Sequence, residues 1–254
     1  MTIKPTITYH YADSSCAELI LTNNITQEYP WHSHAKHWII GIVFSGSVIL
    51  STRSESREFG QNDFFIVPPV VAHSLKVNSG VRLATLCLNT EESLEKNVND
   101  LMNVLCHAPH NSMLEDTLSP SNIERLQFFA KQLAVTLVFE YSQTVLTPSI
   151  QAVAQRLQEH PEAACTLDEM AATAGYSRWH FIRLFQKELG LTPHAYLILC
   201  RLRRLRSMLR GNVSAVEAAV STGFSDQSHM HRVFKLHHCL TPKQFREASI
   251  NLEP

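Results

Sequence analysis

The pattern that decides the fold occurs twice, first as Ala174-Gly-Tyr-Ser177 with Arg183-x-Phe185 and Leu191-Thr-Pro193, then as Thr222-Gly-Phe-Ser225 with Arg232-x-Phe234 and Leu240-Thr-Pro242. The two copies are 48 to 49 residues apart, which is the spacing of a repeated structural unit. Each copy follows a capping-box pattern, Thr166-Leu-Asp-Glu169 and Ser214-Ala-Val-Glu217. A helix that ends at a glycine and is followed by a serine-capped helix is typical of a helix-turn-helix unit.

The second helix of each unit has an apolar face and a polar face. Phe181, Phe185 and Leu189 recur at helical spacing in the first unit, and Met230 and Phe234 do so in the second. The opposite faces carry side chains that suit base edges and phosphates in a major groove. We therefore predict a DNA-reading surface made of Arg178, Trp179, Ile182, Arg183, Gln186, Gln227, Ser228, His231 and Arg232.

Between the units, residues 194–210 are expected to form one helix of about 17 residues, or roughly 25 Å. Such a helix can hold two recognition helices near one turn of DNA apart, about 34 Å. It carries five arginines, at positions 201, 203, 204, 206 and 210. Some are expected to contact phosphate and others to pair with acidic residues of the same domain.

Composition and charge fit a two-part DNA-binding protein. The 254 residues are 44% hydrophobic and 18% charged, with a net charge of −1. Residues 1–164 hold 10 basic and 16 acidic side chains, whereas residues 165–254 hold 12 and 7, so only the second part suits a polyanion. No apolar stretch is long enough for a membrane helix, no secretion signal is evident, and the six cysteines are widely spaced. These features predict a cytoplasmic protein.

The first 88 residues alternate apolar and polar side chains in short runs separated by turn signals, which predicts an antiparallel sandwich or barrel. Helical periodicity follows over residues 91–105 and 122–141. Thr147-Pro148 is a helix-start signal and marks the expected boundary between a domain at 1–146 and a domain at 147–254. The predicted fold class is therefore α+β, a β-barrel with following helices and then an all-α domain.

Residues from about 149 to 246 resemble the DNA-binding domain of AraC/XylS-type transcription regulators. The most specific match is Gly223-Phe-Ser-Asp-Gln-Ser-His-Met-His-Arg-Val-Phe-Lys235 with Leu240-Thr-Pro-Lys-Gln-Phe-Arg246. The resemblance implies seven helices, with DNA-reading helices at 177–189 and 226–237. Cys239 stands where the family usually has glycine, and Ala215 and Ala218 replace larger aliphatic residues. These departures imply looser packing of the second unit.

The front of the chain resembles the cupin-like ligand-binding domain that often precedes this module. The match rests on Trp31-His-Ser-His34, Gly41, Gly46, Gly60-Gln-Asn-Asp63, Pro68-Pro69 and His73. It implies an effector site of Trp31, His32, His34, Trp38 and His73. In cupins a His-x-His pair, a glutamate and a distant histidine bind a metal, so His32, His34 and His73 are the candidate ligands of zinc, nickel, cobalt or iron. Trp38 and Ile39 occupy the place of the glutamate, and His37 is the alternative fourth donor.

Three alternatives remain open for these histidines: a metal site, an organic effector pocket, or a proton-sensing pocket. Aromatic residues there can equally belong to the core. For the whole chain, we expect a regulator without enzymatic activity that binds double-stranded DNA and a small-molecule effector. RNA polymerase is a further expected partner. The helices expected at 91–105 and 122–141 resemble the segment through which such regulators dimerise. A homodimer is therefore expected, with an apolar stripe of Leu126, Phe129, Leu133 and Leu137, although packing on the barrel would need the same stripe. A metal-dependent cupin enzyme and an architectural DNA-binding protein are the competing functions.

Overall fold

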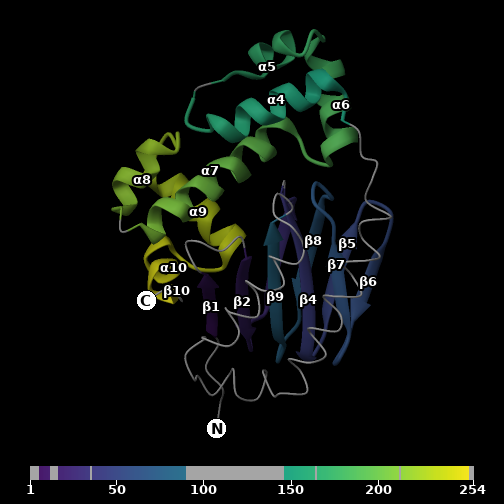
Figure 1. The fold of residues 1–254 in the computed structure, drawn as a ribbon, viewed down its shortest axis with the longest axis vertical. Helices are drawn as coiled ribbons and strands as arrows, with labels where there is room; N and C mark the ends of the chain where they lie inside the picture. Colours follow the sequence, from purple (N-terminus) through teal and green to yellow (C-terminus); the bar gives the residue numbers. More distant parts are fainter. Residues whose placement is uncertain are drawn as a thin grey trace.

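The computed structural model of the protein describes residues 6–11, 17–34, 36–89, 146–163, 165–211 and 213–251. The first three ranges form strands, and the later ones form helices and the short strand β10 (Figure 1); the helix labels begin at α4. The strands are β1 Thr6–Tyr11, β2 Ala17–Asn23, β3 Gln27–His32, β4 His37–Ser45, β5 Val48–Thr52, β6 Ser56–Phe59, β7 Phe64–Val67, β8 His73–Val77, β9 Arg82–Asn89 and β10 Ser249–Asn251. The helices are α4 Pro148–Glu159, α5 Leu167–Thr173, α6 Arg178–Leu189, α7 Pro193–Arg210, α8 Ala215–Ser221, α9 Gln227–His238 and α10 Pro242–Ala248.

The strands build two facing sheets. One has the order β10-β1-β2-β9-β4-β7 and the other the order β3-β8-β5-β6. Among the described strands, every pairing is antiparallel except that of β1 with β10. Strand alternation places one set of apolar side chains between the sheets, among them Val43, Val48, Val77 and Val81, which are fully buried. The α+β prediction is therefore confirmed.

The helix signals of both units are confirmed in part. Thr166 and Glu169 form a reciprocal capping box at α5, while the Ser214 side chain accepts a hydrogen bond from the Glu217 amide. Gly175 and Gly223 have φ of +73° and +80°, the left-handed turn that glycine permits.

Two caps differ from the prediction. Ser177 occupies the N-cap position of α6 without a side-chain cap bond. In the second unit the N-cap is Asp226, not Ser225, and its carboxylate accepts from the His229 amide at 2.7 Å. Aspartate is as good a cap as serine and stands one residue closer to the helix, so it takes the position.

Two helical cores hold the units together. Phe181, Phe185 and Leu189 of α6 are buried against α4, α5 and the start of α7. Met230 and Phe234 of α9 are buried in a second core, which also includes the apolar stripe of α7: Ile198, Leu202, Leu205 and Leu209. The predicted connecting helix thus exists, begins at Pro193 and contributes to both cores.

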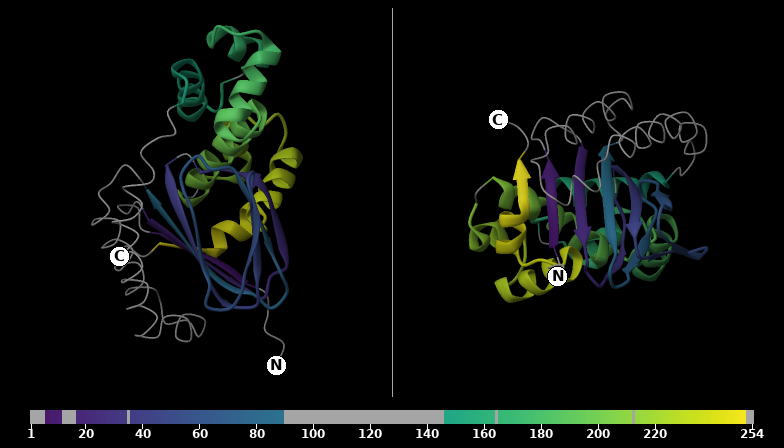
Figure 2. Two further views of the ribbon diagram at one scale, coloured as in Figure 1. Left: turned by 90° about the vertical axis from the view of Figure 1, so that its right-hand side faces the viewer. Right: turned by 90° about the horizontal axis from the view of Figure 1, so that it is seen from below.

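The helical part docks onto the strands at several points. β10 pairs in parallel with β1 and extends the larger sheet, as the right view in Figure 2 shows. The left-handed Gly190 after α6 lies so close to Ala72 that an added Cβ would stand 2.3 Å from the Ala72 Cβ. The Arg53 guanidinium donates to the Gly190 carbonyl at 3.1 Å. These contacts place both helix-turn-helix units against the barrel.

Some sequence predictions fall outside the described residues. The helices expected at 91–105 and 122–141, and with them the dimerisation stripe, belong to this group. The boundary between 146 and 147 coincides with the start of α4 at Pro148, and the division into two domains stays a prediction. In the described ranges no helix has the length and apolarity needed to cross a bilayer.

Candidate effector cavity and DNA-reading surface

A cavity of about 710 Å³ lies between the strands and the helices. One wall comes from alternate residues of the strands, because every second side chain of a strand points to the same face. In β2, for example, these residues are Glu18, Ile20 and Thr22. The other wall comes from α7 and α9. The volume suits a small organic molecule.

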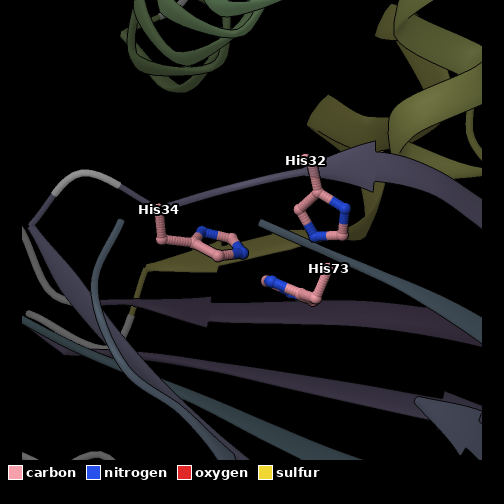
Figure 3. A group of neighbouring side chains, drawn as sticks. All are labelled: His32, His34 and His73. Atoms are coloured by element: carbon pink, nitrogen blue, oxygen red, sulfur yellow. The ribbon is translucent and has the colours of Figure 1, made fainter. Parts of the chain in front are cut away.

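Three histidines gather on the strand side of this cavity and converge on one point (Figure 3). His32 at the end of β3 and His73 at the start of β8 are direct cross-strand partners, and their ring centroids are 4.2 Å apart. His34 follows β3 in the chain, with its ring centroid 5.1 Å from that of His32 and 5.5 Å from that of His73. Residues far apart in the sequence thus form one cluster because of strand register.

Two imidazoles of the cluster, those of His32 and His73, are held in one tautomer by the backbone. Nδ1 of His32 lies 2.7 Å from the Pro30 carbonyl oxygen, and Nδ1 of His73 lies 2.9 Å from the Val71 carbonyl oxygen. Because a carbonyl only accepts hydrogen bonds, both Nδ1 atoms donate, and each Nε2 keeps its lone pair. The lone pairs of two rings are thereby available to a cation or a hydrogen-bond donor.

The cluster is neutral at physiological pH. Burial lowers the pKa of His73 to about 3 and also lowers the pKa of His32. Burial, together with the neighbouring His32, His73 and Arg203, holds the pKa of His34 well below its ordinary value. His32 and His34 keep some exposed area, and both line the cavity. Neutral imidazole is the form that binds metals.

The cluster fits the donor set of a transition metal. One ligand nitrogen from each ring lies within 4.8 Å of the other two. In a tetrahedral site with metal–nitrogen bonds of about 2.0–2.1 Å, ligand nitrogens are about 3.3 Å apart, so small side-chain movements are sufficient. His37 lines the cavity but is not part of this cluster.

Two predicted effector contacts lie elsewhere. Trp31 is 45% exposed, and Trp38 does not line the cavity. Each is next in sequence to a residue that does line it, His32 and Ile39 respectively, and side chains alternate between the two faces of a strand. Trp31 and Trp38 thus do not line this cavity, whereas His32, His34 and His73 do, and the effector role of all five residues stays a prediction.

Sequence reasoning missed the helical wall of the cavity. Arg203, Arg206 and Arg210 of α7 line it, together with His237 and His238 of α9. The three arginines are spaced by three and four residues, which places them on one face of a helix. That spacing was visible in the sequence, but only the fold identifies the cavity as what the face meets.

The arginines of α7 bind protein groups. Arg206 donates two hydrogen bonds to the Glu18 carboxylate, at 2.5 and 2.6 Å, and Arg210 also pairs with Glu18. Their side chains are only 12–20% exposed. Arg204 pairs with Glu162 at 3.1 Å, and the Arg201 guanidinium donates to the Pro161 carbonyl. The expectation that the acidic partners belong to the same domain thus holds for Arg204 and fails for the Glu18 cluster.

Most of the predicted DNA-reading side chains are open to solvent. Trp179 is 74% exposed, which is unusual for an indole outside a binding surface. In α6, Arg178, Arg183 and Gln186 are also exposed, and Ile182 is half-buried. In α9, Gln227, Ser228 and Arg232 are exposed and His231 is half-buried. Arg178 pairs with Asp168 at 3.5 Å, an exposed contact that DNA can replace.

Comparisons with known proteins agree with both halves of this arrangement. A family profile described as an AraC-like ligand binding domain matches residues 17–117, and a helix-turn-helix domain profile matches residues 170–248. "Uncharacterized HTH-type transcriptional regulator YbfI" of Bacillus subtilis is 29% identical over 229 residues, which are 81% of this chain and 82% of the relative. "Probable transcription factor PqrA" of Proteus vulgaris is 38% identical over 85 residues, which are 32% of this chain and 67% of the relative.

A solved structure supports the same fold. The crystal structure of an apo variant of ToxT from Vibrio cholerae superposes with a TM-score of 0.58, over 94% of this chain and 99% of that one, at 11% identity. The names of the relatives designate transcription regulators, which favours a regulator over a metal-dependent cupin enzyme. The chain belongs to the AraC/XylS family of DNA-binding transcription regulators, with a ligand-binding domain in front of its helix-turn-helix units.

Proposed function

We propose that this regulator binds specific DNA sequences through α6 and α9, and that a small-molecule effector in the cavity controls how these helices meet DNA. The observation that carries the proposal is the composition of the cavity wall. It includes residues of α7, which connects the two units, and of α9, which is the second recognition helix. A molecule bound there contacts the sensor and the DNA-binding part at once.

The mechanism follows from that shared wall. Arg203, Arg206 and Arg210 are on α7, so a ligand that moves this helix also moves the two cores into which α7 packs. The effector shifts the arrangement only by the difference between its affinities for the two arrangements. Coupling of this kind is typically about 1–3 kcal/mol, a change of roughly 5–150-fold in DNA affinity.

On the DNA side, each unit contributes different chemistry. Arg183 and Arg232 suit guanine or phosphate, Gln227 suits adenine, and the exposed Trp179 suits a thymine methyl group or a sugar. Loss of one base contact is expected to weaken specific binding by about 1–3 kcal/mol, whereas loss of a phosphate contact weakens binding to all sequences.

Fluorescence anisotropy with promoter fragments from the protein's own operon tests the DNA-binding part of the proposal. We expect specific binding that weakens steeply with salt. Arg183→Ala and Gln227→Ala are expected to weaken binding by roughly 5–150-fold while the melting temperature stays unchanged. Lys243→Ala, a substitution of an exposed residue on α10, is the control. Binding that is independent of salt, or equal in the variants and the control, would contradict the proposal.

Three further features are part of the proposal. We place the protein in the cytoplasm, where DNA is, in line with the scattered cysteines of the sequence; Cys87, Cys165, Cys200 and Cys239 are free thiols. A homodimer rests on the apolar stripe predicted at 122–141, and light scattering of the purified chain tests it. Contact with RNA polymerase stays a prediction for the case in which the protein activates transcription.

A further inference from the structure

We propose that His32, His34 and His73 bind one divalent transition-metal ion through three imidazole nitrogens, and that the remaining coordination position faces the cavity. The inference deepens the proposed function, on which it rests for its regulatory meaning, because it makes the ion part of the effector site. Metal binding itself depends only on the cluster.

The first support is the orientation of the rings. All three side chains point toward one another at one end of the cavity (Figure 3). The Pro30 and Val71 carbonyls hold Nδ1–H of His32 and His73, so that Nε2 of each is the free donor. Metal-binding histidines generally have such an outer partner, which fixes the tautomer and the ring orientation.

The second support is the chemistry of the donor set. The three rings lie against one another, and one ligand nitrogen of each lies within 4.8 Å of the other two. A cation that accepts three lone pairs satisfies all the rings at once. Imidazole donors suit zinc, nickel, cobalt and iron(II) more than calcium or magnesium, which prefer oxygen ligands.

The third support is the space on the open side. His32, His34 and His73 provide three ligands, and within the described ranges no carboxylate joins them. The position left over is directed to a cavity that Arg203 also lines. A dication with three neutral ligands near an arginine favours an oxygen donor with negative charge in that position. Hydroxide or an anionic group of the effector meets this requirement.

Titration of the full chain with cobalt(II), after removal of metal with a chelator, tests the proposal. We expect one equivalent per chain, visible ligand-field absorption typical of a four-coordinate site, and displacement by zinc. His34→Ala removes a ligand from a loop and leaves both carbonyl contacts in place, and we expect its cobalt affinity to fall at least about 100-fold. The control His237→Asn changes a cavity residue outside the cluster, and its affinity is expected to stay within about threefold of the wild type.

Two further readouts separate the possible results. His34→Asp returns an oxygen ligand, so it should bind cobalt more tightly than His34→Ala, with circular dichroism checking the fold of both variants. No cobalt bound by the wild type, or equal affinity in the wild type and His34→Ala, would overturn the metal site. If the metal site fails in this way, DNA binding that still responds to an organic ligand leaves the proposed function in place. If metal binds but does not change the affinity for DNA, the result counts against the ion as an effector.

Discussion

The contact between Glu18 and two arginines of α7 gives the most direct prediction about domain docking. Glu18→Gln removes the negative charge and leaves Arg206 and Arg210 without their shared carboxylate. The three side chains are 12–20% exposed, so water replaces the lost contact only in part. Arg206 also lies 5.4 Å from the Tyr9 ring centroid, and Arg210 lies 4.2 Å from that of Tyr11, so neither guanidinium moves away without losing a second contact.

Breaking a buried ion pair by removing one partner costs about 3–5 kcal/mol, and an exposed pair is worth about 0–1 kcal/mol. Because the exposure is small but not zero, we expect the lower end of the first range, about 3 kcal/mol. For a domain of this size each kcal/mol changes the melting temperature by about 2–4 °C, so Glu18→Gln should lower it by about 6–12 °C.

Differential scanning calorimetry of the full chain measures this change, and Glu28→Gln, at an exposed position of β3, is the matched control. The control should stay within about 0.5 kcal/mol of the wild type. The double variant Glu18→Gln with Arg210→Gln should lose less than the sum of the two single variants, because the second substitution removes a charge that is already unpaired. A melting temperature of Glu18→Gln within about 1 °C of the wild type would refute the role of this contact in docking.

Four other substitutions test separate parts of the fold. Burial lowers the pKa of His10 to about 4, so below pH 6.5 the unfolded chain binds more protons than the folded one, and stability falls as pH falls. His10→Gln should remove roughly 3 kcal/mol of that loss of stability by pH 4, as measured by urea titrations. Parallel curves of stability against pH for the two proteins would contradict this role of His10. Cys239 after α9 and Gly190 after α6 both have a left-handed backbone, with φ of +62° and +75°. Cys239→Gly should therefore stabilise the folded protein by about 1 kcal/mol, and Gly190→Ala should destabilise it by more, because the added Cβ also meets Ala72. Melting temperatures measure both changes. Thr166→Ala should cost about 1 kcal/mol through loss of the α5 cap, and an unchanged denaturation midpoint would show that the cap is dispensable.

The sequence predicted most of the local structure because local signals are physically strong. Glycines at 175 and 223, the Thr166 cap and the Pro148 start mark helix ends through backbone geometry and hydrogen bonds between residues close in sequence. The strands β5 and β7 lie in the front part of the chain, where the short alternating runs predicted strands. The cap at Asp226 was missed because Ser225 and Asp226 are adjacent and both suit the N-cap position, so the pattern alone does not select between them.

The candidate site was predicted less completely because its wall is shared. Histidines at 32, 34 and 73 could be grouped through the His-x-His spacing and the cupin-like pattern, and strand register brings them together. Trp31 does not line the cavity because it is adjacent to the cavity residue His32, and adjacent side chains on a strand point to opposite faces. Glu18 is 188 residues from Arg206 and 192 from Arg210, so nothing local connects them. Their contact is a result of how the helical part docks.

The central claim is that the cavity and the DNA-reading helices are energetically coupled. Anisotropy titrations of the full chain with promoter DNA, with and without a saturating cavity ligand found by thermal shift, test it most directly. We predict that the ligand changes the DNA dissociation constant at least about fivefold, and that DNA changes the ligand's affinity by the same factor, since linkage is reciprocal. A ligand that occupies the cavity and raises the melting temperature while leaving the DNA dissociation constant unchanged would contradict the account.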